Sequence, residues 1–431
     1  MTGRHQTLDP SDPIFISYRQ NDGTAITAEL AWILRTAGIP VWRDRDDLPP
    51  GDTEARLDQA IAAGISGGIL VVTPDVVNSR VVKMVEAPRL IELHQRHQNF
   101  VLGIANSVRN VESRTDYDAP DRLLERRPGQ LSGVDQNPAT REGLKALTRG
   151  LVWHRVASLR ERVENREQTF NLSLQTRNTP QVYDRTGAEL DIRLRPSDHE
   201  RLPNAEGLHD LKDTIGLLPD AVTRSGAHRL CIRGGGHLSV GFAVGAALPS
   251  SRVGKMVVID QKGVDWESQN ESNLHDMSKV QILDEGKNQS AISLGRPSVA
   301  IYIDLLPQRS DTAFNRFLEE SRDFIVAWRH ISNLDNSLID PRDAGRIASE
   351  IAAHIRAISN ENNNAQTHIL LRCPFPLALL VGRLTNTLRC VVYEWDDSDP
   401  IEPGGDYRAR YVPTLKVRAS ASDGAIEEVL I

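Results

Sequence analysis

The chain has 431 residues, of which 25% are charged and 39% hydrophobic, and its net charge is −7. This length predicts two or three domains, because one hydrophobic core stops growing at about 250–300 residues. The acidic balance disfavours a DNA- or RNA-coating protein, and three scattered cysteines disfavour a disulfide framework or a cysteine metal site.

The chain shows no targeting or membrane signal. Residues 1–13 are polar, and no apolar run approaches the roughly 18 residues of a membrane-spanning helix. We therefore expect a cytoplasmic protein with no membrane partner, no DNA partner and no bound metal.

Strands and helices alternate through the N-terminal part. The predicted strands are residues 14–18, 39–42, 67–72 and 100–104, and the predicted helices are residues 25–36, 53–63, 79–96, 121–127 and 141–163. This alternation predicts an α/β fold with a parallel sheet, in which ligands bind at the carboxyl ends of the strands. The charge-dense residues 160–167 mark a boundary, so the predicted domains are residues 1–165 and 168–431.

The C-terminal part contains two stretches of matching pattern, residues 228–260 and 368–395. Each reads as an apolar strand, a turn rich in Gly or Pro, an apolar helix and a second strand, which is a βαβ unit. Paired units of this kind place two helix N-termini near one crevice and favour an anionic ligand. Further predicted strands are residues 170–175, 188–194, 289–294 and 298–304, and further predicted helices are residues 203–218 (with a loop), 312–330 and 342–358.

Three motifs in the N-terminal part resemble a known family. Phe-Ile-Ser-Tyr18, Gly-Ile-Pro-Val-Trp-Arg-Asp44 and Leu-Pro-Pro-Gly-Asp52 are similar to the first two sequence boxes of a bacterial TIR domain, over roughly residues 11–165. The resemblance implies a flavodoxin-like fold. Enzymatic members cleave NAD+ at the nicotinamide–ribose bond with a glutamate on the helix after the third strand, commonly four residues after an aromatic residue. Here the corresponding pair is Val82 and Glu86.

A carboxylate suits this chemistry. Cleavage of the N-glycosidic bond develops oxocarbenium character on the ribose, which a nearby carboxylate stabilises, and nicotinamide leaves as a neutral molecule. Glu86 is therefore the predicted catalytic residue, with Glu92 as a competing acid on the same helix. Tyr18, Trp42, Arg43 and Asp44 are the predicted substrate-binding residues; Trp42 also fits a core position, and Arg43 and Asp44 also fit a solvated loop.

The paired units, with Tyr-Glu-Trp395 ending a core strand, resemble a SAVED domain over about residues 168–431. That family fuses two Rossmann-like units of the CARF type and binds cyclic oligonucleotides. A TIR domain followed by a SAVED domain is similar to effectors of CBASS antiphage immunity. In those effectors the second messenger assembles TIR domains into an active oligomer.

The two turns supply the predicted ligand-binding residues. Phosphates suit the N–H groups of the turns, and arginine or histidine adds charge-assisted hydrogen bonds. Aromatic rings stack on bases, and a carboxylate accepts from an adenine amino group. The predicted residues are Arg233, Gly234, Gly235, Gly236, His237, Arg372, Pro374, Phe375, Glu394 and Trp395. The three glycines also fit a simple tight turn, and Phe375 also fits a core position.

The sequence thus predicts an NAD+ nucleosidase without a cofactor, activated by a cyclic oligoadenylate (cyclic tri-adenylate preferred) and by self-association. NAD+ is its expected substrate, and nicotinamide and an ADP-ribose species are its expected products. A non-catalytic TIR adaptor gated by the same ligand and a nucleosidase acting on another nucleotide remain alternatives. The ring size, the assembly geometry, the form of the ADP-ribose product and a TIR site shared between subunits remain open.

Overall fold

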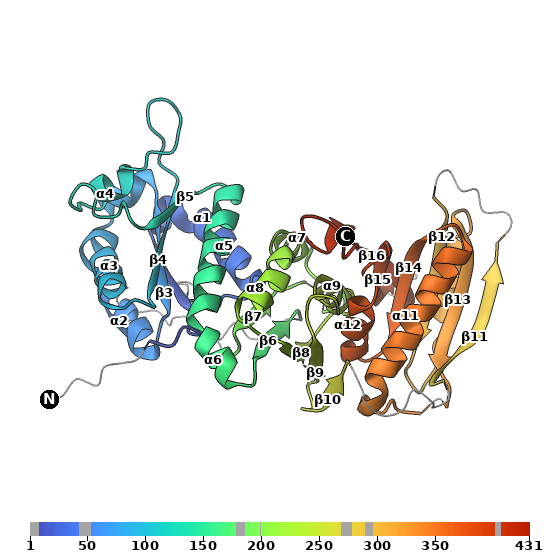
Figure 1. The fold of residues 1–431 in the computed structure, drawn as a ribbon. Helices are drawn as coiled ribbons and strands as arrows, with labels where there is room; N and C mark the ends of the chain where they lie inside the picture. The colour runs from blue at the N-terminus through green and yellow to red at the C-terminus, as the bar shows by residue number, and fades with distance from the viewer. Residues whose placement is uncertain are drawn as a thin grey trace. The chain divides into compact units, whose positions relative to one another are not determined.

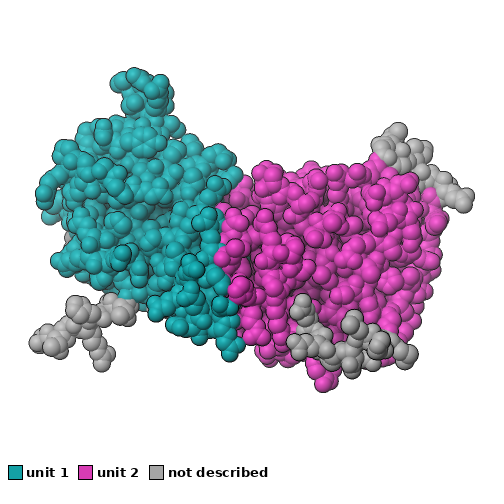
Figure 2. All heavy atoms as spheres, in the orientation of Figure 1, with its two compact units in different colours: residues 1–168, 179–193, 224–226 teal, residues 169–178, 194–223, 227–431 magenta. Residues whose placement is uncertain are grey.

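The computed structural model describes residues 8–42, 53–177, 186–198, 200–268, 278–288, 296–335, 337–400 and 407–431. The chain forms two compact units (Figure 2). The first unit holds residues 1–168, 179–193 and 224–226, and the second holds residues 169–178, 194–223 and 227–431. The domain boundaries that we infer from the sequence, at residues 165 and 168, stay a prediction.

The first unit is built on a parallel sheet with strand order β2-β1-β3-β4-β5, the flavodoxin-like order. Helices α2 and α3 cover one face of this sheet, and α1 and α5 cover the other (Figure 1). The strands of the unit are β1 (Ile14–Tyr18), β2 (Val41–Trp42), β3 (Gly67–Val72), β4 (Val101–Asn106), β5 (Asp135–Pro138) and β7 (Leu190–Arg193). Its helices are α1 (Gln20–Thr36), α2 (Thr53–Ala63), the 3₁₀ turn η1 (Pro74–Asn78), the π-helical turn η2 (Val82–Glu86), α3 (Ala87–Arg96), α4 (Ala119–Leu123), α5 (Arg141–Ser158) and α6 (Arg160–Asn165).

Helices on both faces explain the apolar strands of this sheet. Every residue of β1 and of β3 is buried, as expected for parallel strands that are covered on two sides. Two glycines in β3 let neighbours approach closely: a Cβ added to Gly68 would lie 2.8 Å from the side chain of Leu90 in α3. Helix α3 therefore lies tightly against β3, which fixes the residues that precede it. The predicted α/β fold with a parallel sheet is confirmed.

The second unit contains two sheets. One includes the strands β10-β9-β8-β6 in that order, and the other has the order β11-β13-β12-β14-β15-β16-β17. The strands are β6 (Thr169–Gln175), β8 (Arg229–Gly235), β9 (Lys255–Ile259), β10 (Asp265–Glu267), β11 (Val280–Lys287), β12 (Ser298–Asp304), β13 (Ile325–Asn333), β14 (Gln366–Arg372), β15 (Cys390–Pro400), β16 (Tyr407–Val417) and β17 (Ile426–Val429). The helices are α7 (Ala205–Thr214), η3 (Ile215–Leu217), α8 (Leu218–Arg224), α9 (Leu238–Ala247), α10 (Thr312–Glu320), η4 (Pro341–Asp343), α11 (Ala344–Glu361) and α12 (Phe375–Arg383).

Alternating residues of β12 pack into two different cores. Ala300 and Tyr302 face a cluster that includes Phe314 of α10, whereas Val299 faces a cluster that includes Ile358 of α11. Because successive side chains of a strand point to opposite faces, α10 and α11 cover opposite faces of the seven-stranded sheet. Figure 1 shows α11 lying across β12 and β13.

The prediction of one helix over residues 312–330 is wrong. Helix α10 ends at Glu320, and β13 follows, parallel to β12 and antiparallel to β11. Residues 325–333 contain β-branched and aromatic residues that favour a strand, and burial between two neighbouring strands decides the outcome. The predicted strand at residues 289–294 lies outside the described residues. None of the helices in the described residues has both the length and the hydropathy that crossing a bilayer would require.

Helices α9 and α12 touch through glycines. A Cβ added to Gly245 of α9 would lie 2.0 Å from the backbone oxygen of Leu379, and one added to Gly382 of α12 would lie 2.1 Å from the backbone oxygen of Phe242. The two contacts are reciprocal, since each helix places a glycine against a carbonyl of the other. They join the two βαβ units at backbone distance, which no larger residue permits.

We expect Gly245→Ala and Gly382→Ala to lower the free energy of unfolding by at least about 1–3 kcal/mol each, because the added methyl group meets a backbone oxygen that no rotamer change can move. Thermal unfolding of the full chain measures the effect. Gly133→Ala is the control, since a Cβ there meets no heavy atom within 4 Å. Equal midpoints for all four proteins would contradict the prediction.

Candidate functional site

A hollow of about 180 Å³ lies in the first unit at the end of β1, where Ile16, Tyr18, Arg19 and Glu86 are among its lining residues. Glu86 is only 6% exposed. Its carboxylate Oε2 accepts a hydrogen bond of 2.6 Å from the hydroxyl of Ser17 in β1. A buried carboxylate is therefore held at the carboxyl end of the parallel sheet, the edge at which open α/β sheets bind ligands.

The backbone at Glu86 departs from a regular α-helix. Residues 82–86 form a π-helical turn in which the N–H of Ala87 donates to the carbonyl of Val82. Pro88 follows at the start of α3; proline lacks an N–H and its ring collides with the carbonyl four residues earlier, that of Met84. The wider turn removes this conflict, and single π turns are frequent at functional sites.

A network of polar side chains holds Arg19, which lines the hollow, and the start of α1. Asp22 accepts from the hydroxyl of Thr73 at 2.6 Å and from the backbone N–H of Asp75 at 2.9 Å. Asp75 in turn accepts from Nδ2 of Asn21 at 2.8 Å and from Nε of Arg19 at 3.3 Å. These bonds join the start of α1 to the turn after β3, so the rim beside Glu86 is pre-ordered.

The four predicted substrate-binding residues differ in their relation to the hollow. Tyr18 lines it, and Trp42 packs against the apolar cluster beneath α2 and α3. Arg43 and Asp44 lie outside the described residues. The competing acid Glu92 is half-exposed and pairs with Arg89 and Arg96 on the surface of α3, with N–O distances of 2.9 and 2.7 Å. The structure thus brings Glu86 and Tyr18 together and places Glu92 elsewhere.

In the second unit, the glycine turn after β8 packs tightly against β6. A Cβ on Gly234 would lie 2.1 Å from the carbonyl oxygen of Leu174, and one on Gly236 would lie 1.9 Å from Oγ1 of Thr176. Gly234 also has a φ of 134°, which favours glycine. These contacts explain two of the glycines by packing alone, and a ligand contact of Gly234, Gly235 and Gly236 stays a prediction.

His237, the N-cap residue of α9, is buried in the same turn. Its backbone N–H donates to Oγ1 of Thr176 at 2.8 Å, and its ring contacts Thr176 and the carbonyl of Glu200. Burial, and secondarily the charge of Arg177, lowers the pKa of His237 to about 4. The imidazole is therefore neutral near pH 7, and it would meet a phosphate as a neutral group rather than as a cation.

The N-terminus of α9 is bound by a carboxylate of this chain. Glu394 of β15 is 6% exposed, and its Oε1 accepts from the backbone N–H of Ser239 at 2.6 Å. Burial raises the pKa of Glu394 to about 7, although the hydrogen bonds with Ser239 act in the opposite direction. The predicted role of Glu394, accepting from an adenine amino group, stays a prediction; the structure shows that it caps a helix of the other βαβ unit.

The two predicted ligand arginines differ in position. Arg233 lies four residues before the N-cap of α9, whereas Arg372 lies two residues before Pro374, the N-cap of α12. The two arginines therefore lie at different distances from the helix that follows each of them. Arg233 is exposed, and no partner for it is found among the described residues. Arg372 pairs with the buried Asp304 on the neighbouring strand, with Nη1 and Oδ1 2.5 Å apart.

The two predicted stacking residues are each half-buried. A Cβ added to Gly241 of α9 would lie 2.8 Å from Cε2 of Phe375, so this ring contacts the other helix. The guanidinium of Arg201 lies 5.4 Å from the ring centre of Trp395, in a cation–π contact. Base stacking by Phe375 and Trp395 stays a prediction. Sequence reasoning missed Ser17 and Asp304, which become visible only when strand neighbours are known.

We expect wild-type stability to fall relative to Glu394→Gln as the pH rises from 5.5 to 8. The folded protein holds the Glu394 proton up to about pH 7, whereas the unfolded chain releases it near 4.5, so the free energy of unfolding decreases through this window. The full shift corresponds to about 3 kcal/mol. Glutamine keeps an oxygen for the Ser239 N–H. Thermal midpoints at both pH values test this, with Glu319→Gln on the surface as control; parallel pH curves for wild type and Glu394→Gln would contradict it.

Comparison with known proteins agrees with this geometry. A TIR domain family model matches residues 14–115, and the model of the SMODS-associated and fused to various effectors sensor domain (SAVED) matches residues 212–417. A search of curated proteins found no match.

Among solved structures, the chain is similar to the Cap4 SAVED/CARF-domain containing receptor of Acinetobacter baumannii with the cyclic trinucleotide 2'3'3'-cAAA, at 11% identity and a TM-score of 0.45, covering 92% of this chain and 97% of that one. It is also similar to Cap4 of Moraxella osloensis, at 11% identity and a TM-score of 0.40, with coverage of 92% and 97%. The chain therefore carries an N-terminal TIR domain followed by a C-terminal SAVED domain.

Proposed function

We propose that the protein is a ligand-activated NAD+ nucleosidase of the CBASS type. The observation that carries this proposal is the Glu86 carboxylate, buried and held by Ser17 in a hollow at the carboxyl edge of the TIR sheet. The TIR domain is joined in one chain to a domain of the SAVED sensor family, and this supports control by a ligand. No cofactor is needed for this reaction, since water completes it.

The proposed reaction balances with one water molecule. The bond between the ribose C1′ and the nicotinamide nitrogen breaks, and its electron pair leaves with the ring, which becomes neutral. Glu86 faces the positive charge that develops on the ribose. Water then adds to C1′ and releases a proton, which gives ADP-ribose. Because the leaving group is neutral, a single carboxylate suffices and no strong general acid is required.

The dimensions of the hollow suit one end of the dinucleotide. Its volume of about 180 Å³ is below the roughly 300–1,000 Å³ of pockets that enclose whole drug-sized ligands. We therefore infer that the nicotinamide riboside end enters beside Glu86. The predicted contacts of Arg43 and Asp44 would serve the remainder of the substrate.

On the sensor side, we propose that the SAVED domain binds a cyclic oligoadenylate, with cyclic tri-adenylate preferred. Binding must favour the assembled state for activation to follow, because a ligand shifts an equilibrium only by its differential affinity. Head-to-tail contacts between TIR domains would allow open-ended assembly. A site shared between subunits is part of this proposal.

We expect Glu86→Gln to reduce NAD+ turnover at least about a hundredfold while ligand binding is unchanged, because the amide cannot stabilise the developing cation. The assay measures NAD+ loss by purified full chain with a panel of cyclic di-, tri- and tetranucleotides, and light scattering follows the mass of the same samples. Glu92→Gln on the same helix is the matched control. Tight binding of one nucleotide without any turnover would favour the adaptor alternative, and full activity of a monomer would refute activation by assembly.

We expect Arg233→Ala to weaken binding of the activating nucleotide about 10–100-fold, since a charge-assisted hydrogen bond contributes about 1.5–3 kcal/mol. Arg229→Ala is the control, because Arg229 is also exposed and lies on the same face at the other end of β8. Calorimetric titration measures both. If the two variants lose affinity equally, or if neither does, Arg233 does not contact the ligand.

A further inference from the structure

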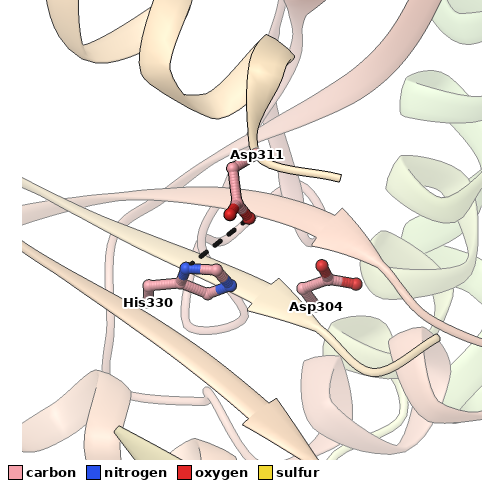
Figure 3. Close-up of side chains that lie close together, drawn as sticks. All are labelled: Asp304, Asp311 and His330. Carbon is pink, nitrogen blue, oxygen red and sulfur yellow. Dashed lines mark ion pairs between the residues drawn. The ribbon is translucent and has the colours of Figure 1, made fainter. Parts of the chain in front are cut away.

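Three side chains that can bind a metal meet beneath α10 in the second unit. Asp304 is the last residue of β12, His330 lies in β13, and Asp311 is the N-cap residue of α10. One potential ligand atom from each lies within 4.8 Å of the others. Figure 3 shows the three side chains at the corners of a triangle, with Nδ1 of His330 toward Asp311 and the other ring nitrogen on the side of Asp304.

The sheet register explains why these residues meet. Tyr302 pairs with His330 across the parallel strands β12 and β13, and their rings lie 4.7 Å apart. Asp304 is two residues beyond Tyr302 and therefore points to the same face of the sheet. Helix α10 covers this face, so its N-cap residue Asp311 reaches the same place. The fold thus gathers residues that are 7 and 19 positions apart.

Two of the polar atoms in this cluster are buried and have no partner among the described residues. They are Nε2 of His330 and Oδ1 of Asp311. His330 is only 4% exposed, so water does not satisfy its ring freely. The contact between Nδ1 of His330 and Oδ1 of Asp311, at 3.9 Å, is too long for a hydrogen bond. Buried polar atoms normally have partners, so both atoms are exceptions that need an explanation.

Asp304 carries the support that metal ligands usually have. Its Oδ1 lies 2.5 Å from Nη1 of Arg372, and its Oδ2 accepts a long hydrogen bond of 3.3 Å from the N–H of Ser310. The loop that contains Ser310 is held because the Tyr302 hydroxyl donates to the Ser310 carbonyl at 2.7 Å. Ligating carboxylates are commonly oriented by such outer partners. Arg372 balances only one of the two carboxylates, although Arg309 also acts electrostatically on His330.

We propose that Asp304, Asp311 and His330 form a binding site for a divalent transition-metal ion of the Zn²⁺ type. One imidazole and two carboxylates are ligands that Zn²⁺ accepts, and three protein ligands leave a position for water. The ion would link β12, β13 and α10. This proposal is independent of NAD+ cleavage.

Titration of the chelator-treated full chain with Zn²⁺ tests the site. We expect wild type to bind one more high-affinity equivalent than Asp311→Asn or His330→Gln, or to bind it at least about tenfold more tightly. His354→Gln is the matched control, since this half-buried histidine on α11 is outside the cluster. Asp311 has a side chain that is 45% exposed, so its substitution keeps the test valid if His330→Gln fails to fold.

Two further measurements decide the outcome. X-ray absorption of the zinc-loaded wild type should show nitrogen and oxygen ligands at about 2.0–2.2 Å without sulfur. Zn²⁺ should also raise the thermal midpoint of wild type and of His354→Gln but not that of Asp311→Asn, because binding to the folded state stabilises it. Identical zinc binding by wild type and Asp311→Asn, or sulfur ligation, would overturn the proposal and leave an ordered water as the occupant of the cluster.

Discussion

The second unit depends on the backbone contact between its helices α9 and α12. Gly245 and Gly382 each meet a carbonyl oxygen of the opposite helix, so the two βαβ units are joined where neither can shift without the other. Arg383 at the end of α12 makes a second connection between the two helices. Its buried side chain donates hydrogen bonds to the carbonyls of Leu248, Val253 and Gly254, which follow α9. Glu394 forms the third connection, at the start of α9. A displacement of one βαβ unit would therefore also move the other.

The cap formed by Glu394 bears on the prediction that this turn binds an anion. A helix N-terminus favours an anion, and in α9 this place is held by a carboxylate of the chain itself. The same burial that raises the pKa of Glu394 to about 7 makes the charged form costly. A phosphate near this turn would compete with Glu394 for the same N–H groups, and protonation of Glu394 would weaken its side of that competition. Another donor of the turn, the N–H of His237, is bound to Thr176.

Local hydrophobic patterns in the sequence predict much of this fold. The predictions that are wrong concern segments whose structure depends on pairing between distant strands. The apolar runs of β1 and β3 identify a covered parallel sheet, because such strands need no alternation. The predicted helix over residues 312–330 runs on into residues 325–333, which form a strand paired with β11 and β12. The same strand pairing brings Asp304, Arg372 and His330 together. The spacing of Asp304 and His330 along the sequence matches no metal motif. Glu86 was predictable from family resemblance, whereas its partner Ser17 follows from tertiary packing alone.

The position of Glu86 follows from a local backbone conflict that packing resolves. Pro88 forbids a regular helical turn before α3, and the π turn that replaces it lies between a helix held against Gly68 and the strand that carries Ser17. A longer or shorter turn would rotate residue 86 away from β1, because each residue of a helix turns by about 100°. The carboxylate is thus fixed from both sides. In the proposed cleavage of NAD+, such pre-ordering would favour electrostatic stabilisation of the developing cation, since a group that must reorganise during a reaction loses part of its effect.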